Sequence, residues 1–240
     1  MECYSFSKVG SYHRALEMPN EDCVASVKTP NGIVVSVICD GAGSKKAGGI
    51  AARILAPKIL HWMATSFSEQ YFSEGETVRR RLVGLVRRTL QEYADTSGVE
   101  ECELGCTIMV GGVAPDGRCL CLNLGDGWIL DQKKDNLDNQ AGIVSLPERG
   151  IVAQSTYLTS SSELFAHIRY YRWKDTETKK VILLTDGAAE NLVNTDQLDE
   201  CNITAACRFE KNEIFEFLTA QNPQDDYSCS ILLIDNGNLM

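Results

Sequence analysis

The sequence lacks the long apolar runs of membrane proteins and the cationic excess of nucleic-acid-binding proteins. No apolar run in its 240 residues approaches the roughly 20 residues that span a bilayer, so no transmembrane helix is expected. The first eight residues contain neither a basic nor an apolar region, and no secretory signal is expected there. Acidic residues outnumber basic ones by 33 to 23, giving a formal charge of −10, which disfavours nucleic acid and anionic lipid membranes as partners.

The ten cysteines form no recognisable metal or disulfide pattern. No Cys-x-x-Cys pair occurs, and no cysteine lies near a histidine at zinc-ligand spacing. Cys39, Cys119, Cys121 and Cys229 fall in apolar runs, where a reduced thiol packs as a small hydrophobe. Because cytosolic thiols stay reduced, we predict ten free thiols, no bound zinc and a cytoplasmic location.

Several catalytic signatures are also missing. No cysteine is followed by arginine six positions later, as a cysteine-dependent phosphatase requires. Gly41 and Gly43 begin a dinucleotide fingerprint, but Lys46 replaces its third glycine. Gly43 and Gly48 have P-loop spacing, but Gly49 replaces the lysine. Neither Gly-x-Ser-x-Gly nor His-Glu-x-x-His occurs.

The patterns that are present predict an α+β fold in a single domain spanning residues 1–240. No internal repeat, low-complexity tract or linker-like segment divides the chain. The strand signals fall at 3–9, 22–28, 33–39, 104–113, 118–124, 127–131, 166–173, 180–184 and 228–234. These strands are interrupted by two adjacent long helices and one later helical stretch, which is not the regular alternation of βαβ units.

Three segments carry helical signals. Apolar residues recur at helical spacing from Ile50 to Met63, and Pro57 is expected to kink or split this helix. A second amphipathic helix is predicted at about 76–95, and the five arginines on its other face favour a solvated surface over a docking patch. A mixed helical stretch is expected at about 195–220.

Acidic residues occur at the ends of five predicted strands. In chain order they are Glu21-Asp22, Asp40, Asp126, Asp186 and Asp225-Asp226. Asp-Gly is ordinary turn chemistry, but Asp40 and Asp186 each follow a hydrophobic strand and precede a glycine that lets a backbone carbonyl approach an ion. Rigid strand ends that converge at one edge offer the oxygen ligands that hard divalent cations prefer.

This ordered set resembles the metal-dependent protein phosphatases of the PP2C family, in their compact bacterial branch. The segments that carry the resemblance are Asn20-Glu21-Asp22, Val37–Gly43, Gly105-Cys106-Thr107, Leu122–Gly127, Thr156–Ser160, Leu184–Gly187 and Asp225–Ser228. The resemblance implies an αββα sandwich of two antiparallel sheets flanked by helices, with a dimetal site at one end of the sheets.

The resemblance also implies which residues hold two Mn²⁺ or Mg²⁺ ions. Asp40 is expected to bridge both ions. Asp186 and Asp225 are expected to complete the first site, and Glu21 with the Gly41 carbonyl oxygen the second.

The implied activity is serine/threonine phosphatase chemistry, with Asp22, Asp40 and Asp186 as catalytic residues. Asp22 is expected to orient metal-bound water, and Asp126 with Asp186 matches the third-metal site of some members. A hydroxide shared by the ions is expected to attack phosphorus directly, without a covalent phosphoenzyme. The substrate is then a phosphoprotein, the opposing enzyme a Ser/Thr kinase, and the protein a monomer.

The sequence departs from the family where phosphate is held. Glu17 stands where many members carry a phosphate-binding arginine, and Ala42 stands where many carry a histidine that protonates the leaving group. His13 and Arg14 are the nearest candidates for phosphate binding, and the alternative is that the metals alone bind phosphate. Two other functions stay open: a PP2C-fold binding protein without activity, and a phosphatase for a small phosphoester.

Overall fold

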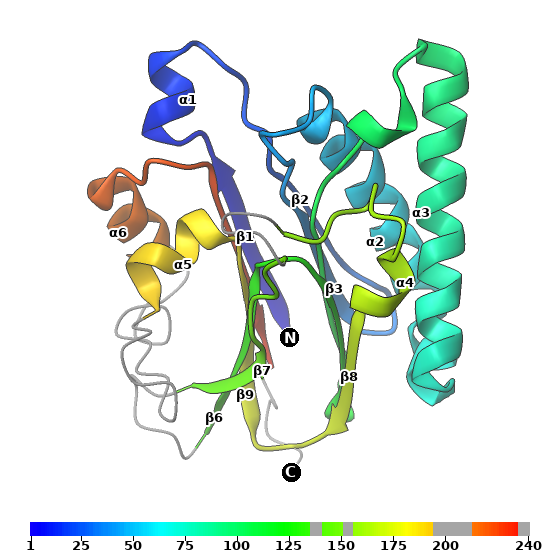
Figure 1. Ribbon diagram of the computed structural model, residues 1–240. Helices are drawn as coiled ribbons and strands as arrows, with labels where there is room; N and C mark the ends of the chain where they lie inside the picture. Colours follow the sequence, from blue (N-terminus) through cyan, green and yellow to red (C-terminus); the bar gives the residue numbers. More distant parts are fainter. Residues whose placement is uncertain (135–140, 151–155, 194–212, 235–240) are drawn as a thin grey trace.

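Two antiparallel sheets packed face to face form the centre of the molecule (Figure 1). The structure is a computed structural model that describes residues 1–134, 141–150, 156–193 and 213–234. One sheet has the strand order β1-β10-β9-β6-β7 and the other β2-β3-β4-β5-β8. The strands are β1 Glu2–Lys8, β2 Cys23–Lys28, β3 Val34–Cys39, β4 Ile108–Val113, β5 Arg118–Leu124, β6 Trp128–Lys133, β7 Gly142–Ser145, β8 Arg169–Lys174, β9 Thr178–Leu184 and β10 Tyr227–Leu233. The predicted α+β sandwich is confirmed.

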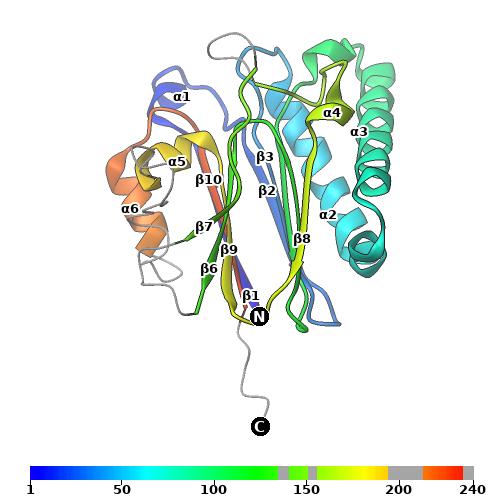
Figure 2. The ribbon, with the colours of Figure 1, turned by 60° about the horizontal axis from the view of Figure 1, so that its bottom comes forward.

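Helices cover both outer faces of the paired sheets (Figure 2). The long helices α2 and α3 pack on the β2-β3-β4-β5-β8 sheet, and α5 and α6 pack on the other sheet. The helices are α1 Ser11–Ala15, α2 Gly48–Phe72, α3 Gly75–Ser97, α4 Leu164–His167, α5 Asp186–Leu192 and α6 Glu213–Gln221, with a 3-10 turn at Glu101–Glu103. Among the described residues, no helix combines the length and apolar character that crossing a membrane requires.

Alternation along the strands divides the apolar side chains among three layers. On β3, Val35, Val37 and Cys39 pack toward α2 and α3, whereas Val34 and Ile38 belong to the layer between the sheets. A third layer lies between the other sheet and α5 and α6. Because β3 is buried on both faces, its sequence is a continuous apolar run instead of an alternating one.

Most predicted strands appear close to the expected bounds, and one difference lies beside the acidic residues. The strand expected from residue 104 begins at Ile108. The preceding residues instead bond to the loop after β3: the Ala42 amide donates to the Gly105 carbonyl oxygen at 3.1 Å, and Gly41 forms a β-bridge with Cys106. Tertiary contacts, not a strand, therefore order this segment.

Short helices account for most of the remaining differences. Periodicity does not predict α1, α4 or α5, because helices of four to seven residues are too short to show a repeating apolar face. Of the helical stretch expected at 195–220, α6 is present, and residues 194–212 lie outside the described part of the chain.

The prediction that Pro57 kinks or splits its helix is wrong. Helix α2 continues through Pro57 to Phe72, and its irregular residue is Ser66, with φ −126° and ψ 17°. Pro57 and Arg53 are both exposed, so water can satisfy the Arg53 carbonyl that the proline leaves without an amide partner. At Ser66 the hydroxyl group donates to the Trp62 carbonyl oxygen at 2.6 Å, a contact that competes with the helical hydrogen bonds.

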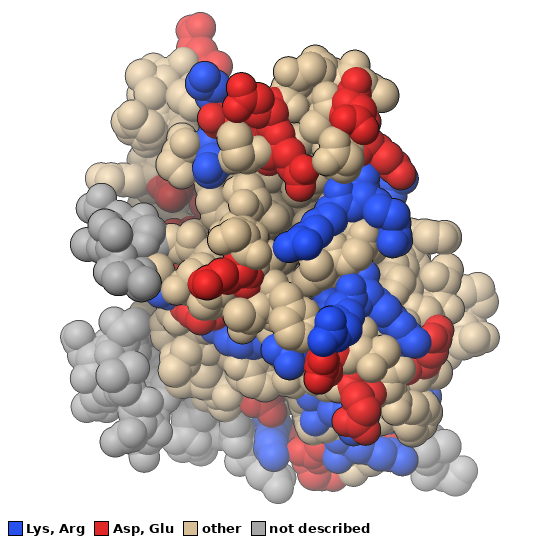
Figure 3. All heavy atoms as spheres, turned by 45° about the vertical axis from the view of Figure 1, so that its right-hand side comes forward, with Lys and Arg blue, Asp and Glu red and all other residues tan. Residues whose placement is uncertain are grey.

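The arginines of α3 contribute to a basic band on the outer helical layer (Figure 3). Arg80 pairs with Glu76 one turn earlier, at 2.6 Å, and both side chains are largely exposed. Arg79 and Arg80 also lie over the ring of Phe165. Exposed pairs of this kind add little stability, which agrees with a solvated helix face.

The eight cysteines in the described residues are free thiols, and Cys201 and Cys207 lie outside those residues. Cys39, Cys119, Cys121 and Cys229 are buried in strands, as the apolar runs predict, and Cys102 is exposed. Burial raises the pKa of Cys119 to about 12. A thiol with such a pKa stays protonated at neutral pH and is a poor nucleophile.

Candidate active site

An acidic pocket of about 910 Å³ lies at one end of the two sheets. The predicted site residues that line it are Glu21, Asp40, Gly41, Asp126, Asp186 and Asp225, together with His13. Asp40 and Asp126 follow strands of one sheet, whereas Asp186 and Asp225 flank strands of the other. The face-to-face packing of the sheets therefore gathers acidic residues from distant parts of the chain.

Asp40 is held at the end of β3 through its backbone. The Thr107 amide donates to the Asp40 carbonyl oxygen at 2.8 Å, and the Asp40 amide donates to Thr107 Oγ1 at 3.3 Å. Gly41 then packs against the start of α2, where an added Cβ atom would lie 2.5 Å from the Gly49 nitrogen. It would also lie 2.7 Å from the Glu21 carbonyl oxygen, so glycine allows all three segments to meet.

Asp186 and Asp225 are brought together by the pairing of β9 with β10. The Thr185 amide donates to the Ser228 carbonyl oxygen at 3.1 Å, and the Ser228 amide donates to Thr185 Oγ1 at 2.9 Å. Asp186 is the first residue of α5, and the following Gly187 packs closely on the segment before β10. A Cβ atom on Gly187 would lie 3.2 Å from Cβ of Asp225, so a side chain there would push the two segments apart.

Asp126 lies in the turn between β5 and β6, which is fixed by contacts to its preceding residue. The Arg169 guanidinium donates to the Gly125 carbonyl oxygen at 2.6 Å, and the Glu148 amide donates to the same oxygen at 2.9 Å. These contacts hold the turn at the pocket and leave the Asp126 side chain as part of its lining.

Glu21 and Asp22 each have one buried carboxylate oxygen without a hydrogen-bond partner, Glu21 Oε2 and Asp22 Oδ1. The other Asp22 oxygen accepts a hydrogen bond from Ser228 Oγ at 2.6 Å. Asp22 is only 6 % exposed and is not part of the pocket lining. Buried carboxylate oxygens without partners are costly, and a compensating cation is one way to offset that cost.

Burial and the charges of neighbouring acids raise the pKa values of Glu21, Asp22, Asp40, Asp126 and Asp225. Burial is the largest cause and raises the pKa of Asp22 to about 8 and that of Asp126 to about 6. Burial, followed by the charge of Asp22, holds the pKa of Asp40 well above its ordinary range. A bound cation would favour the ionised forms and reverse this direction.

Asp226 connects the pocket to the segment before β2, a role that its place beside Asp225 does not reveal in the sequence. Its Oδ1 accepts a hydrogen bond from the Gly10 amide at 2.7 Å. Its Oδ2 accepts from the Glu21 amide at 2.7 Å and is 2.9 Å from His13 Nδ1. One buried carboxylate thus positions a predicted metal ligand and a predicted phosphate-binding residue.

His13 and Arg14 are neighbours in α1 but have different surroundings. His13 is 8 % exposed and lines the pocket, and its contact with Asp226 engages Nδ1. The Arg14 guanidinium donates to the Val9 carbonyl oxygen at 2.5 Å and to Asn222 Oδ1, and Arg14 is not part of the lining. The structure therefore brings His13, and not Arg14, to the acidic residues.

The donor set fits a hard divalent cation. Seven acidic residues line the pocket, among them the five predicted carboxylate ligands, and oxygen ligands such as these and the Gly41 carbonyl suit Mg²⁺ and Mn²⁺. Within the described ranges, no three His, Cys, Asp or Glu side chains are already arranged closely enough to hold an ion. Carboxylates that repel one another are expected to lie farther apart than ligands drawn around a shared ion.

Comparisons with known proteins agree with this geometry. The sequence matches the family model described as Protein phosphatase 2C over residues 9–224. A search of curated proteins finds no match. A bacterial serine phosphatase superposes with a TM-score of 0.72 and 14 % identity, covering 100 % of both chains.

Two further solved structures have the same fold. Stp1, a serine/threonine phosphatase from Staphylococcus aureus, has a TM-score of 0.69 and 14 % identity, covering 98 % of this chain and 95 % of its own. PppA, described as a key regulatory component of T6SS in Pseudomonas aeruginosa, has a TM-score of 0.67 and 17 % identity, covering 96 % of each chain. At identities this low, the structural superpositions establish the fold alone. The family match extends over most of the sequence. The chain belongs to the protein phosphatase 2C family.

Proposed function

We propose that this protein is a Mn²⁺- or Mg²⁺-dependent phosphatase that hydrolyses phosphoserine and phosphothreonine in proteins. The observation that carries the proposal is the convergence of five carboxylates from both sheets on one pocket. Membership of the family supports the reaction class, and similarity to solved serine and serine/threonine phosphatases supports the choice of substrate.

Asp40 is the proposed shared ligand of two ions. The other proposed ligands are Asp186 and Asp225 for the first ion, Glu21 and the Gly41 carbonyl oxygen for the second, and Asp126 for a third. When bound, such ions lower the pKa of water toward neutrality and offset charge on phosphoryl oxygens. The position of Asp40 directly after β3, an interior strand of its sheet, with all of these groups lining the same pocket, supports the sharing.

The side chains beside the ligands have proposed roles in orienting water and holding phosphate. Asp22 is fixed by Ser228, and its unpartnered Oδ1 is available to accept a hydrogen bond from, and so orient, a metal-bound water. His13 is fixed through Nδ1, which leaves Nε2 as the ring nitrogen available to donate to a phosphoryl or leaving-group oxygen. Arg14 has other partners, so we favour His13 as the phosphate-binding residue.

The proposal includes the setting in which the enzyme acts. Residues 1–240 are proposed to form one catalytic domain that acts as a cytoplasmic monomer and opposes a Ser/Thr kinase.

The test is hydrolysis of p-nitrophenyl phosphate and of a phosphothreonine peptide, with and without Mn²⁺. Asp40→Asn should lower turnover by at least about 100-fold and still unfold cooperatively. Asp116→Asn, the same substitution in the exposed β4–β5 turn, is the matched control and should leave turnover unchanged. Wild-type rates in Asp40→Asn, or full activity after exhaustive chelation, contradict the proposal.

The same assay separates the two other functions that the sequence leaves open. Turnover of neither substrate with Mn²⁺ or Mg²⁺ would favour an inactive binding protein with this fold. Turnover of p-nitrophenyl phosphate without turnover of phosphopeptides would favour a small phosphoester as substrate.

A further inference from the structure

Exposed apolar side chains gather on the segment that carries α1. Within the described residues, the exposed large hydrophobic residues are Tyr12, Leu16, Met18, Val27, Phe72 and Leu146. Three of these six lie within seven residues of one another, with exposed fractions of 63 %, 53 % and 38 % for Tyr12, Leu16 and Met18. Single exposed hydrophobic residues are normal, whereas a local cluster of them points to a binding surface. Tyr12, Leu16 and Met18 are called the α1 rim below.

The backbone under the α1 rim is firmly attached to the rest of the protein. The Ser11 amide donates to the Pro223 carbonyl oxygen at 2.8 Å, and the Tyr12 amide to the Gln224 carbonyl oxygen at 3.0 Å. The Met18 amide donates to the His13 carbonyl oxygen at 2.9 Å, which closes the turn after α1. The exposed side chains therefore project from an ordered base, and binding a ligand there costs little backbone entropy.

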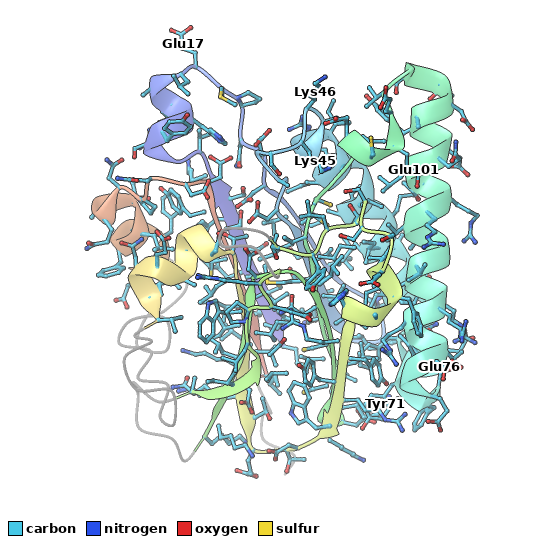
Figure 4. All side chains as sticks on the ribbon, viewed as in Figure 1. Glu17, Lys45, Lys46, Tyr71, Glu76 and Glu101 are labelled. Atoms are coloured by element: carbon cyan, nitrogen blue, oxygen red, sulfur yellow. The ribbon has the colours of Figure 1, made fainter. Side chains whose placement is uncertain are left out.

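The α1 rim is continuous with the acidic pocket. Tyr12 and Met18 line the pocket together with His13, and the exposed Leu16 follows Tyr12 by one helical turn, its amide donating to the Tyr12 carbonyl oxygen at 3.3 Å. Glu17, next to Leu16, lies at the same end of the molecule as Lys45 and Lys46 (Figure 4). A chain that placed a phosphorylated residue in the pocket would bring its neighbours to this surface, because residues one to three positions away lie roughly 3.5–10 Å along an extended chain.

We infer that the α1 rim binds an apolar side chain next to the phosphorylated residue of a protein substrate, and so selects which phosphoserines or phosphothreonines enter the pocket. The inference rests on the proposed function, because it concerns the substrate of the same pocket. The apolar character of Tyr12, Leu16 and Met18 argues for an apolar partner, and the continuity with the pocket argues that this partner is the substrate.

The experiment measures binding separately from turnover. A fluorescent peptide carries a phosphonate analogue of phosphoserine, whose carbon–phosphorus bond the enzyme cannot hydrolyse. Each position from three before to three after this residue is set to Leu or Ser in turn. Fluorescence anisotropy with Mn²⁺ gives the Kd of each peptide, and hydrolysis of p-nitrophenyl phosphate tests the proposed function independently.

Leu16→Ser is the informative variant, because Leu16 is exposed and is not part of the pocket lining. Phe72→Ser is the matched control: Phe72 is 71 % exposed and follows Tyr71, which lies at the opposite end of the molecule from Glu17 (Figure 4). We expect the wild type to bind the Leu peptide about fivefold more tightly than the Ser peptide at one or more positions. Leu16→Ser should lose most of this preference, whereas Phe72→Ser should retain it, and both should hydrolyse p-nitrophenyl phosphate normally.

Equal affinity of the wild type for Leu and Ser peptides at every position overturns the inference, as does an equal loss of preference in both variants. Concentration-dependent dimerisation that Leu16→Ser abolishes, without any peptide preference, would assign the α1 rim to a second copy of the chain and also overturn it. A Leu preference that Leu16→Ser removes, in a protein that hydrolyses nothing, supports the inference while the proposed function fails.

Discussion

The middle and the end of the sheet sandwich are built from the same strands but have opposite energetics. Between the sheets, Val34 and Ile38 of β3 pack with Leu183 of β9, and the inward hydroxyl groups of Ser36 and Ser230 bond to each other at 2.6 Å. The apolar side chains contact one another and the two hydroxyl groups satisfy each other, so burial of this region stabilises the fold.

Asp40 follows the end of β3, two residues beyond Ile38, and lies among the acidic residues of the pocket at the end of the sandwich. There the carboxyl groups have raised pKa values, and oxygens of Glu21 and Asp22 lack partners. Apolar packing in the middle of the sandwich therefore offsets the electrostatic repulsion among the carboxylates at its end. Substitutions in the two regions should therefore have opposite effects on stability.

The largest stability change is expected in the middle of the sandwich. Leu183→Ala should lower the free energy of unfolding by about 2–5 kcal/mol, because it leaves a cavity between the sheets at a fully buried site. Urea unfolding followed by circular dichroism measures the change. Leu146→Ala, at an exposed leucine, is the control and should change stability by less than about 0.5 kcal/mol. Equal losses in the two variants would contradict a packed layer between the sheets.

A smaller change, of opposite sign, is expected at the acidic end in metal-free protein. The pKa values of Asp22 and Asp126 are raised to about 8 and about 6, so the folded state binds more protons than the unfolded state between about pH 4 and pH 8. Stability should therefore fall as pH rises through this window. Asp40→Asn removes one of the buried carboxyl groups whose pKa is raised and should flatten the dependence.

Urea unfolding at pH 5 and pH 8 in the presence of a chelator measures this dependence, and added Mn²⁺ should reverse the loss at pH 8. The matched Asp116→Asn protein should keep the pH dependence of the wild type, because Asp116 lies in an exposed turn. Stability that rises from pH 5 to pH 8 in the chelated wild type would show that the acidic end is not strained.

Substitution of Asp226 should lower the free energy of unfolding by an intermediate amount, because Asp226 belongs to the acidic end but has hydrogen-bond partners. Asp226→Ala leaves the buried Gly10 and Glu21 amides without an acceptor and should cost about 1–3 kcal/mol. Because it also releases His13, the acid side of the pH–rate profile should change. Asp226→Asn keeps the shape and one acceptor and should recover part of both losses. Identical pH profiles in all three proteins would limit Asp226 to a structural role.

The smallest effect is expected for Asp126, which lies in a turn at the pocket and not at the centre of the acidic group. Asp126→Ala should raise the Mn²⁺ concentration needed for half-maximal activity by about tenfold, with little loss of rate at saturating metal. A metal titration of p-nitrophenyl phosphate hydrolysis measures this shift. An unchanged titration would mean that Asp126 is an ordinary turn residue.

Much of the fold and the acidic positions follow from local patterns. The β-branched run before Asp40 predicts β3, and the acid-glycine pairs predict that Asp40 and Asp186 lie just beyond the ends of β3 and β9. These features depend on neighbours in the sequence, which is why periodicity detects them. Patterns fail where a local preference is overridden, as at Pro57, whose exposed position in α2 lets water replace the lost hydrogen bond.

The partners of the site residues do not follow from local patterns. His13 and Arg14 are adjacent and equivalent candidates in the sequence, yet Asp226 engages the first while Val9 and Asn222 engage the second. Both residues lie in α1, a helix of five residues that is too short to give a periodic signal in the sequence. Backbone hydrogen bonds to residues 223 and 224 hold this helix in place.

The sequence by itself determined most of the strands, though not the short β7, together with which strands are flanked by carboxylates and the chemistry those carboxylates suit, because each of these depends on residues close together in the chain. Only the tertiary structure decided that acids from both sheets share one pocket, that Asp226 positions both Glu21 and His13, and that the α1 rim stays exposed beside them. Those features arise when the two sheets pack face to face and the first and last strands, β1 and β10, pair, and no local preference specifies which distant residues will then meet.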